Sequence, residues 1–173
     1  MLTKVPVRSK VDPKFTWNAE SVFKSEKAWK KEVTQILQEL PTVKAYQGRL
    51  AEGPSVLLEA LSCAHELLSR AQKAFMYAGF AYAVDTTNQE AAGRRGQAQG
   101  MYGQVISAIS FLQPEILSLG KETLDQWLTE NKDLAIYRQS FADLFRKQAH
   151  VRSAEVEELL GLVSDYLLVQ LFR

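Results

Sequence analysis

The stretch GRRGQAQGMYG, residues 93–103, decides the fold, because it sets glycines into a chain otherwise rich in helix-forming residues. The glycines are Gly93, Gly96, Gly100 and Gly103. They could form a loop whose backbone approaches a phosphate, or they could line one face of a helix. At about 100° per residue they fall within roughly 80° of one another on a helix. The stretch matches neither the G-x-x-x-x-G-K-[ST] nor the G-x-G-x-x-G phosphate pattern, and no strand pattern precedes it. We therefore expect a helix, with Arg94 and Arg95 on a solvated face.

A stripe of alanines occurs in the sequence before the glycines and repeats their 3-4-3 spacing. Its members are Ala71, Ala74, Ala78 and Ala81. Two successive helices joined by a short turn are expected to be antiparallel neighbours. A glycine stripe facing an alanine stripe would let the two backbones approach to the usual 8–10 Å or closer. Four interior glycines cost about 3–4 kcal/mol relative to alanine. We predict that close packing of these two stripes offsets that cost.

The hydrophobic residues recur mainly at helical spacing, and no alternating strand pattern extends beyond a few residues. We predict an all-α fold, a helical bundle with no sheet. Its main feature is a hairpin of two long antiparallel helices, about 54–84 and 88–112, joined by the turn DTTN. Gly53-Pro54 suits the start of the first helix, because a proline at the first helical position gives up no hydrogen bond.

Capping residues and prolines predict where the helices begin and end. The candidate N-terminal caps are Asn18, Ser25, Thr87 with Glu90 in a capping box, Asp133 and Ser153. Pro41 is expected to kink or end the helix that Ser25 starts, and Pro114 to break the helix after the turn. A short helix is expected at about 114–118, and another from about Lys121 to Thr129.

The composition is that of a globular domain, with 173 residues, 46% hydrophobic and 24% charged, and a net charge of +1. Residues 1–50 hold ten Lys or Arg against five Asp or Glu. This segment could contact nucleic acid, but we favour a solvated, flexible leader over residues 1–14. The single cysteine, Cys63, excludes an internal disulfide. The longest apolar run, residues 75–84, is too short to span a bilayer. We expect a cytoplasmic protein without a membrane or nucleic-acid partner.

The segment HELLS, residues 65–69, comes nearest to a catalytic motif. The zinc motif H-E-x-x-H needs a second histidine one helical turn after the first. Ser69 occupies that position, and a hydroxyl is a poor zinc ligand. Cys63 lies two residues before His65 and would point to a different face of the helix. The sequence also lacks the G-x-S-x-G nucleophile elbow. We therefore assign this chain no catalytic residue, no metal ligand and no cofactor.

Four stretches of sequence are more informative together than any one alone. They are FTWNAESVFKSEKAW (15–29), YAGFAYAVDTTNQEA (77–91), SFLQPEIL (110–117) and LAIYRQSFADLFRKQAHVRSAEVEELL (134–160). In this order and spacing they resemble the N-terminal region of the oligoendopeptidase F family, within the thimet-like zinc metallopeptidases. The resemblance covers about residues 15–162. It implies structural roles for Trp17, Phe23, Asp85, Thr86, Pro114, Glu115, Tyr137 and His150.

The resemblance also implies a function. In that family the N-terminal region is a bundle of helices that forms one wall, or lid, over a deep cleft. Zinc is bound by H-E-x-x-H and a distant glutamate in a later catalytic domain, which this sequence does not reach. We therefore expect a non-catalytic lobe of a zinc endopeptidase that acts on short peptides. The missing catalytic domain and the peptide substrate would be its partners, and zinc would be the cofactor of the missing domain.

The predicted organisation is a leader (1–14), a helical lobe (15–162) and an apolar tail of the last helix (163–173). An apolar tail needs something to pack against, so we keep a second function open. In this alternative the chain is a stand-alone helical interaction module, and the tail packs on its own bundle or joins two copies into a homodimer.

Overall fold

The structure is a computed structural model that describes residues 6, 8–148, 156 and 158–160. The described residues form helices, turns and bends with no strand, which confirms the all-α prediction. The α-helices are α1 (Glu26–Lys44), α2 (Pro54–Val84), α3 (Gln89–Ile109), α4 (Leu112–Leu119), α5 (Lys121–Glu130) and α6 (Arg138–Arg146). Short 3₁₀ segments connect them or precede them: η1 (Arg8–Lys10), η2 (Pro13–Phe15), η3 (Ala19–Ser21), η4 (Leu50–Glu52) and η5 (Lys132–Tyr137).

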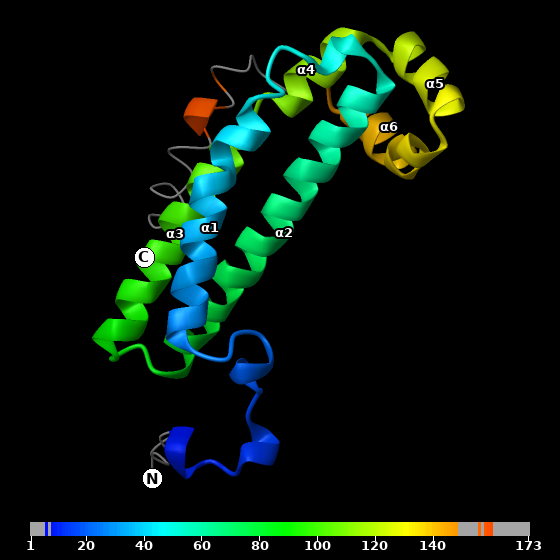
Figure 1. The fold of residues 1–173 in the computed structure, drawn as a ribbon. Helices are drawn as coiled ribbons and strands as arrows, with labels where there is room; N and C mark the ends of the chain where they lie inside the picture. Colours follow the sequence, from blue (N-terminus) through cyan, green and yellow to red (C-terminus); the bar gives the residue numbers. More distant parts are fainter. Residues whose placement is uncertain (1–5, 7, 149–155, 157, 161–173) are drawn as a thin grey trace.

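The three long helices α1, α2 and α3 lie side by side and form the body of the molecule (Figure 1). Helices α2 and α3 run antiparallel, as predicted for the hairpin, and α1 runs antiparallel to α2 (Figure 1). The shorter helices α4, α5 and α6 gather around the end of the body where α2 begins (Figure 1). The turn between α2 and α3 therefore lies at the opposite end, next to the N-terminal segment.

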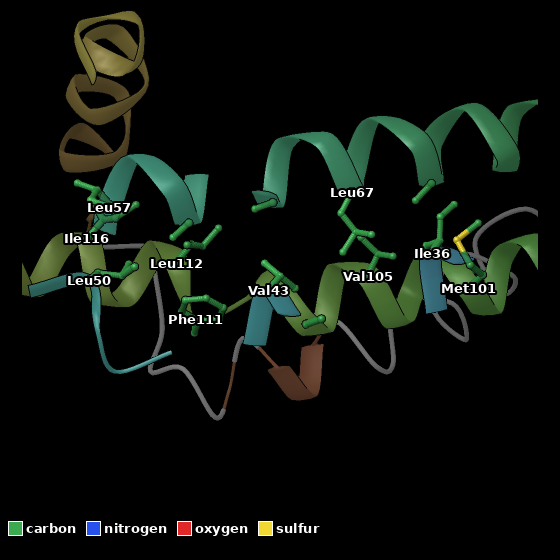
Figure 2. Close-up of a cluster of buried hydrophobic side chains, with 14 of the residues drawn as sticks. Ile36, Val43, Leu50, Leu57, Leu67, Met101, Val105, Phe111, Leu112 and Ile116 are labelled. Atoms are coloured by element: carbon green, nitrogen blue, oxygen red, sulfur yellow. The ribbon is translucent and has the colours of Figure 1, made fainter. Parts of the chain in front are cut away.

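A continuous hydrophobic core runs along the whole length of α2. Figure 2 shows part of it, with Leu67 of α2 close to Val105 of α3 and Leu57 of α2 close to Ile116 of α4. The largest buried side chain is Trp29 of α1, whose indole Nε1–H donates to the Ala74 carbonyl at 3.0 Å. Helix α1 begins where Ser25 Oγ accepts from the Ala28 amide at 3.2 Å, as predicted for this cap.

A bridging arginine adds a polar link between α1 and α2. Arg70 of α2 donates through Nε to Glu32 at 2.7 Å and through Nη1 to Glu39 at 2.6 Å. The three side chains are only partly exposed, so the ion pairs are less screened than pairs on an open surface. The position of α1 on α2 is thus held at Trp29 by packing and at Arg70 by charge.

Several predicted helix boundaries are corrected by the structure. Pro41 does not end α1, which continues to Lys44. The fixed φ of proline is compatible with a helix, so α1 tolerates the missing amide donor and the crowding of the proline ring against the carbonyl four residues earlier. Asn88, rather than Thr87, caps α3, and its Oδ1 accepts from the Ala91 amide at 3.0 Å. Pro114 lies inside α4 at its third residue, where helical amides have no intrahelical partner.

The second half of the chain shows one further correction. Asn131, rather than Asp133, supplies the cap, and it caps the 3₁₀ segment η5 that precedes α6. Asn18 caps η3 as predicted, by accepting from the Ser21 amide at 3.3 Å. The predicted cap at Ser153 and the tail 163–173 lie outside the described residues.

The packing predicted for the glycine stripe is corrected at three of its four positions. Ala71, Ala74 and Ala78 are fully buried in the core, and Ala81 is half-buried. The buried residues of α3 are Ala91, Ala98, Met101, Gly103, Val105, Ser107 and Ala108. Gly93 and Gly96 are exposed and Gly100 is half-buried. A Cβ built on any of these three meets nothing within 4 Å among the described residues. The spacing identified a helix, but α3 turns a different face toward α2.

Candidate functional site: a pocket beside the hairpin turn

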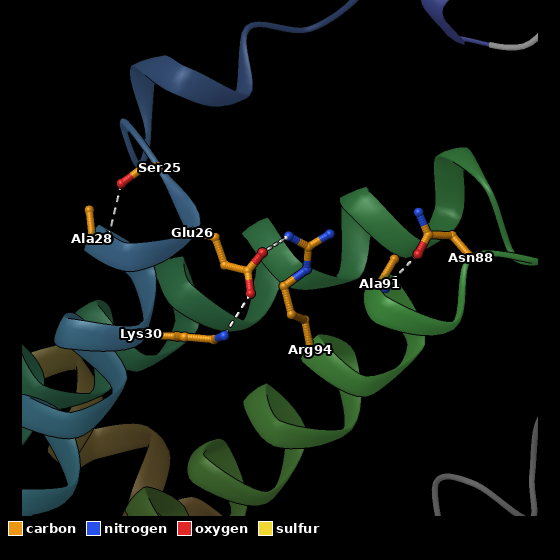
Figure 3. Close-up of polar contacts among 7 residues, drawn as sticks. All are labelled: Ser25, Glu26, Ala28, Lys30, Asn88, Ala91 and Arg94. Carbon is orange, nitrogen blue, oxygen red and sulfur yellow. Dashed lines mark hydrogen bonds and ion pairs between the residues drawn. The ribbon is translucent and has the colours of Figure 1, made fainter.

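The turn between α2 and α3 is built by two short polar side chains. Asp85 Oδ1 accepts from the Thr87 amide at 3.0 Å and from Thr87 Oγ1 at 2.6 Å. These hydrogen bonds stabilise the ionised form and hold the pKa of the Asp85 carboxyl below its usual range. Asn88 then starts α3 by capping Ala91 (Figure 3). Asp85 thus shapes the predicted turn through its hydrogen bonds, and both Asp85 and the neighbouring Thr86 are exposed.

Aromatic side chains fasten the N-terminal segment to α2 beside this turn. The ring of Trp17 lies edge-on to Phe80, with centroids 5.1 Å apart, and Phe23 lies edge-on to Tyr77 at the same distance. Arg8 Nη2 donates to the Trp17 carbonyl at 2.8 Å, which closes the segment back on itself. Trp17 and Phe23 therefore act as anchors between segments that are far apart in the sequence.

A pocket with a volume of about 600 Å³ lies beside the hairpin turn, and we call it the turn pocket. The N-terminal segment, the last turns of α2, the hairpin turn and the start of α3 all contribute to its walls. Its lining residues are Pro6, Arg8, Trp17, Ala19, Tyr77, Ala81, Val84, Asp85, Thr87, Asn88 and Arg94. The walls combine aromatic and aliphatic surface with a few charged groups, as is typical of pockets that bind small ligands.

Arg94 lies on the α3 side of the turn pocket and is partly buried, whereas a solvated position was predicted. Its Nη1 donates to Glu26 at 2.8 Å, and Glu26 also accepts from Lys30 at 2.8 Å (Figure 3). The hydrogen bond from Lys30, followed by the attraction of Arg94, lowers the pKa of the Glu26 carboxyl. The Nε of Arg94 is buried without a hydrogen-bond partner among the described residues. Arg95 is exposed, as predicted, and lies over the Tyr82 ring at 4.9 Å.

The segment HELLS lies at the surface of α2, where His65, Glu66 and Ser69 are all exposed. Cys63 is half-buried, and its burial raises the pKa of the thiol, which the nearby carboxylates of Glu66 and Glu39 raise further. A protonated thiol is a weak nucleophile and a weak metal ligand. Within the part of the chain that the structure describes, no three His, Cys, Asp or Glu side chains lie close enough to hold a metal ion. The HELLS segment offers zinc one histidine, with a poor ligand, Ser69, at the position of the second.

Pro114, Glu115 and Tyr137, which the resemblance also singled out, lie at the far end of the molecule. Glu115 Oε1 accepts from the Gly48 amide at 2.7 Å and so ties α4 to the turn after α1. The ring of Tyr137 stacks on Phe141 with centroids 6.2 Å apart. Pro114 is half-buried in α4, and His150 lies outside the described residues. Pro114, Glu115 and Tyr137 are not among the residues that line the turn pocket.

Arg8 and Arg94 were not predicted as pocket residues. The signal for Arg94 was its position one and a half turns after the Asn88 cap, which puts it near the start of α3 and close to the turn. No sequence pattern indicated Arg8, because its position depends on how the N-terminal segment folds back. None of the described helices is long and apolar enough to cross a membrane.

Comparisons with known proteins identify the class of this lobe. Residues 115–168 match the N-terminal family model of M3 peptidases, described as Oligopeptidase F. Oligopeptidase PepF of Bacillus subtilis is 32% identical over 164 residues, which are 95% of this chain and 24% of that protein. Group B oligopeptidase PepB of Streptococcus agalactiae is 30% identical over 91% of this chain and 26% of that protein.

Solved structures agree with the sequence matches. The crystal structure of oligoendopeptidase-F from Enterococcus faecium matches with a TM-score of 0.77 and 26% identity, over 82% of this chain and 28% of that one. A putative peptidase from Chlamydophila abortus matches with a TM-score of 0.74 and 25% identity, over 91% of this chain and 27% of that one. The fold is thus that of an M3 peptidase N-terminal region. Within that class, the chain corresponds to the N-terminal region of the oligoendopeptidase F family. It spans about a quarter of the length of the relatives it matches.

Proposed function

We propose that this chain is a non-catalytic lobe of an oligoendopeptidase F-like zinc metalloendopeptidase and forms a wall or lid of the cleft that admits short peptides. The supporting observation is the uneven coverage of the matches. The relative from Bacillus subtilis aligns with 95% of this chain, yet the aligned part is only 24% of that relative. The remaining three quarters of such an enzyme would carry the chemistry, and this lobe would restrict access to it.

The side chains of the described residues support a role through shape. His65 is exposed on α2 with Ser69 at the position of a second zinc-binding histidine, and burial raises the pKa of the Cys63 thiol. We propose that zinc binds in the catalytic part and that this part, together with the peptide substrate, is the partner of the lobe. A cytoplasmic location belongs to the same proposal and is supported by the single cysteine of the chain.

A steric role requires a rigid body rather than a reactive group. The continuous core along α2 and the ion pairs of Arg70 with Glu32 and Glu39 make the three long helices one such body. A rigid wall can exclude folded proteins from a cleft while unfolded peptides pass, and motion of the whole wall can gate product release.

The first test uses the purified chain with zinc and an internally quenched peptide. We expect no cleavage above background, and efficient cleavage that a chelator abolishes would overturn the non-catalytic assignment. The second test replaces the N-terminal quarter of the Bacillus subtilis relative with this chain. We expect the chimera to cleave the same peptide in a chelator-sensitive manner, while the relative without its N-terminal quarter does not. A folded but inactive chimera would count against the lobe function.

A further inference from the structure

The turn pocket has an excess of positive charge over its immediate carboxylates. Arg8 is held by the Trp17 carbonyl and forms no ion pair among the described residues. Arg94 must share the Glu26 carboxylate with Lys30. Asp85 is the carboxylate in the lining, and its Oδ1 is already engaged by Thr87. In the lining itself, two arginines thus stand beside one carboxylate.

Arginine guanidinium groups prefer carboxylates and phosphates as ligands, because their N–H donors match two oxygens at once. In Arg94, one terminal nitrogen is used by Glu26, while the buried Nε–H has no acceptor among the described residues. A guanidinium carries five N–H donors, so the terminal nitrogens of Arg8 and Arg94 keep donors that an oxygen-bearing anion in the turn pocket could accept.

Part of the remaining wall of the turn pocket is apolar, beside the polar side chains of Thr87 and Asn88. Trp17, Tyr77, Ala81 and Val84 line it, and Val84 is 44% exposed although it ends a helix with a hydrophobic core face. Phe80, on the same helix and against Trp17, is 45% exposed. An inorganic anion would leave this apolar surface uncovered. A ligand that carries an apolar group next to its negative charge would cover the surface and pair the arginines.

We propose that the turn pocket binds the C-terminal end of a short peptide, with its carboxylate at Arg8 and Arg94 and an apolar last side chain against Trp17, Tyr77 and Val84. A volume of about 600 Å³ is sufficient for such an end. The choice of a peptide as ligand rests on the proposed function, whereas the charge and the shape are properties of the pocket itself. The site would favour peptides whose free carboxylate lies at this end of the lobe.

The test compares two substitutions on the last turns of α2. Ala81→Leu places a larger side chain in the pocket wall, whereas Ala83→Leu adds the same group at an exposed position outside the lining. Binding of a short peptide with leucine as its last residue is measured by calorimetry and by the indole N–H resonance of Trp17. We expect the natural chain and Ala83→Leu to bind alike, and Ala81→Leu to bind at least about tenfold more weakly. If Ala81→Leu does not fold, Val84→Trp takes its place, because Val84 is half-exposed.

The charge is tested on the ligand and on the protein. The same peptide with a C-terminal amide should bind about tenfold more weakly than the free acid. Arg8→Gln retains a donor for the Trp17 carbonyl and should reduce this preference for the acid. The inference would be overturned if the acid and the amide bound equally, or if the two leucine variants bound equally. It would also be overturned if the peptide caused no shift of the Trp17 resonance. If inorganic phosphate displaced the peptide and bound with the same affinity as the peptide, the pocket would be a simple anion site, and the inference would also be overturned. An active chimera combined with no peptide binding would refute this inference while the lobe function stands.

Discussion

Trp29 connects α1 to α2 by both packing and a hydrogen bond, so it is the residue whose loss should matter most. Trp29→Phe removes the donor to the Ala74 carbonyl and leaves a gap at a fully buried position. We expect the free energy of unfolding to fall by about 2–4 kcal/mol, since the lost hydrogen bond and the cavity both contribute. Urea denaturation measures the change. Trp127→Phe, at a half-buried position of α5, is the matched control and should cost about 1 kcal/mol or less. Equal losses would contradict the central role of Trp29.

Glu26 makes the stability of the lobe depend on pH. Its pKa is lowered from 4.5 in the folded state, first by the hydrogen bond from Lys30 and then by the attraction of Arg94. A carboxylate with a lowered folded-state pKa contributes stability above its unfolded pKa and loses it as the pH falls through the folded value. We therefore expect the urea midpoint of the natural chain to fall more steeply than that of Glu26→Gln between about pH 5 and pH 3. Parallel curves for the two proteins would show that the ion pairs at Glu26 contribute nothing.

Residues that hold local structure were easier to predict than residues that form the turn pocket. Asn18, Ser25 and Asp85 act within a few residues of themselves, so their positions in the sequence were sufficient. Arg8 and Arg94 line the same pocket only because the N-terminal segment folds back on the hairpin turn. That return depends on the contact of Trp17 with α2, which local propensity does not encode.

The hairpin of α2 and α3 shows that, for whole helices too, the sequence predicts local structure better than tertiary packing. The long helix after Gly53-Pro54 and the helical nature of the glycine stretch could be predicted, because both follow from spacing within one helix. The rotation of α3 about its own axis could not be predicted in this way. The glycine spacing and the spacing of Ala98, Met101 and Val105 are both helical, and only the packing against α1 and α2 selects the second set as buried.

The exposed glycines of α3 give a direct test of that rotation. Gly96→Ala adds a methyl group that meets nothing within 4 Å among the described residues and restricts the unfolded chain. We expect it to stabilise the chain by about 0.5–1 kcal/mol, measured as a shift of the urea midpoint. Gly120→Ala is the opposite control, because Gly120 has a φ of 81° and alanine is strained there. Destabilisation by Gly96→Ala would mean that another surface packs closely against this side of α3.

The molecule as a whole has two ends, formed by different helices, that share one hydrophobic core. The body of α1, α2 and α3 contains Trp29, and the group of α4, α5 and α6 contains Trp127, which packs against the same buried cluster. Leu57 near the start of α2 and Leu134 of η5 are fully buried where the two ends meet. A lobe that works as a rigid wall requires these ends to be coupled, and the shared core supplies a physical basis for that coupling.

This coupling predicts that both ends unfold together. The indole N–H resonances of Trp29 and Trp127 should disappear at the same urea concentration in one sample, because neither end has a separate core. Leu134→Ala, which removes a buried side chain of a segment that contacts α2, α5 and α6, should lower both midpoints together. The expected loss is about 2–5 kcal/mol. Ile136→Ala, in the same segment but 76% exposed, should leave both midpoints nearly unchanged. If Leu134→Ala lowered only the Trp127 midpoint, the two ends would be independent units, and the lobe could bend between them rather than move as one wall.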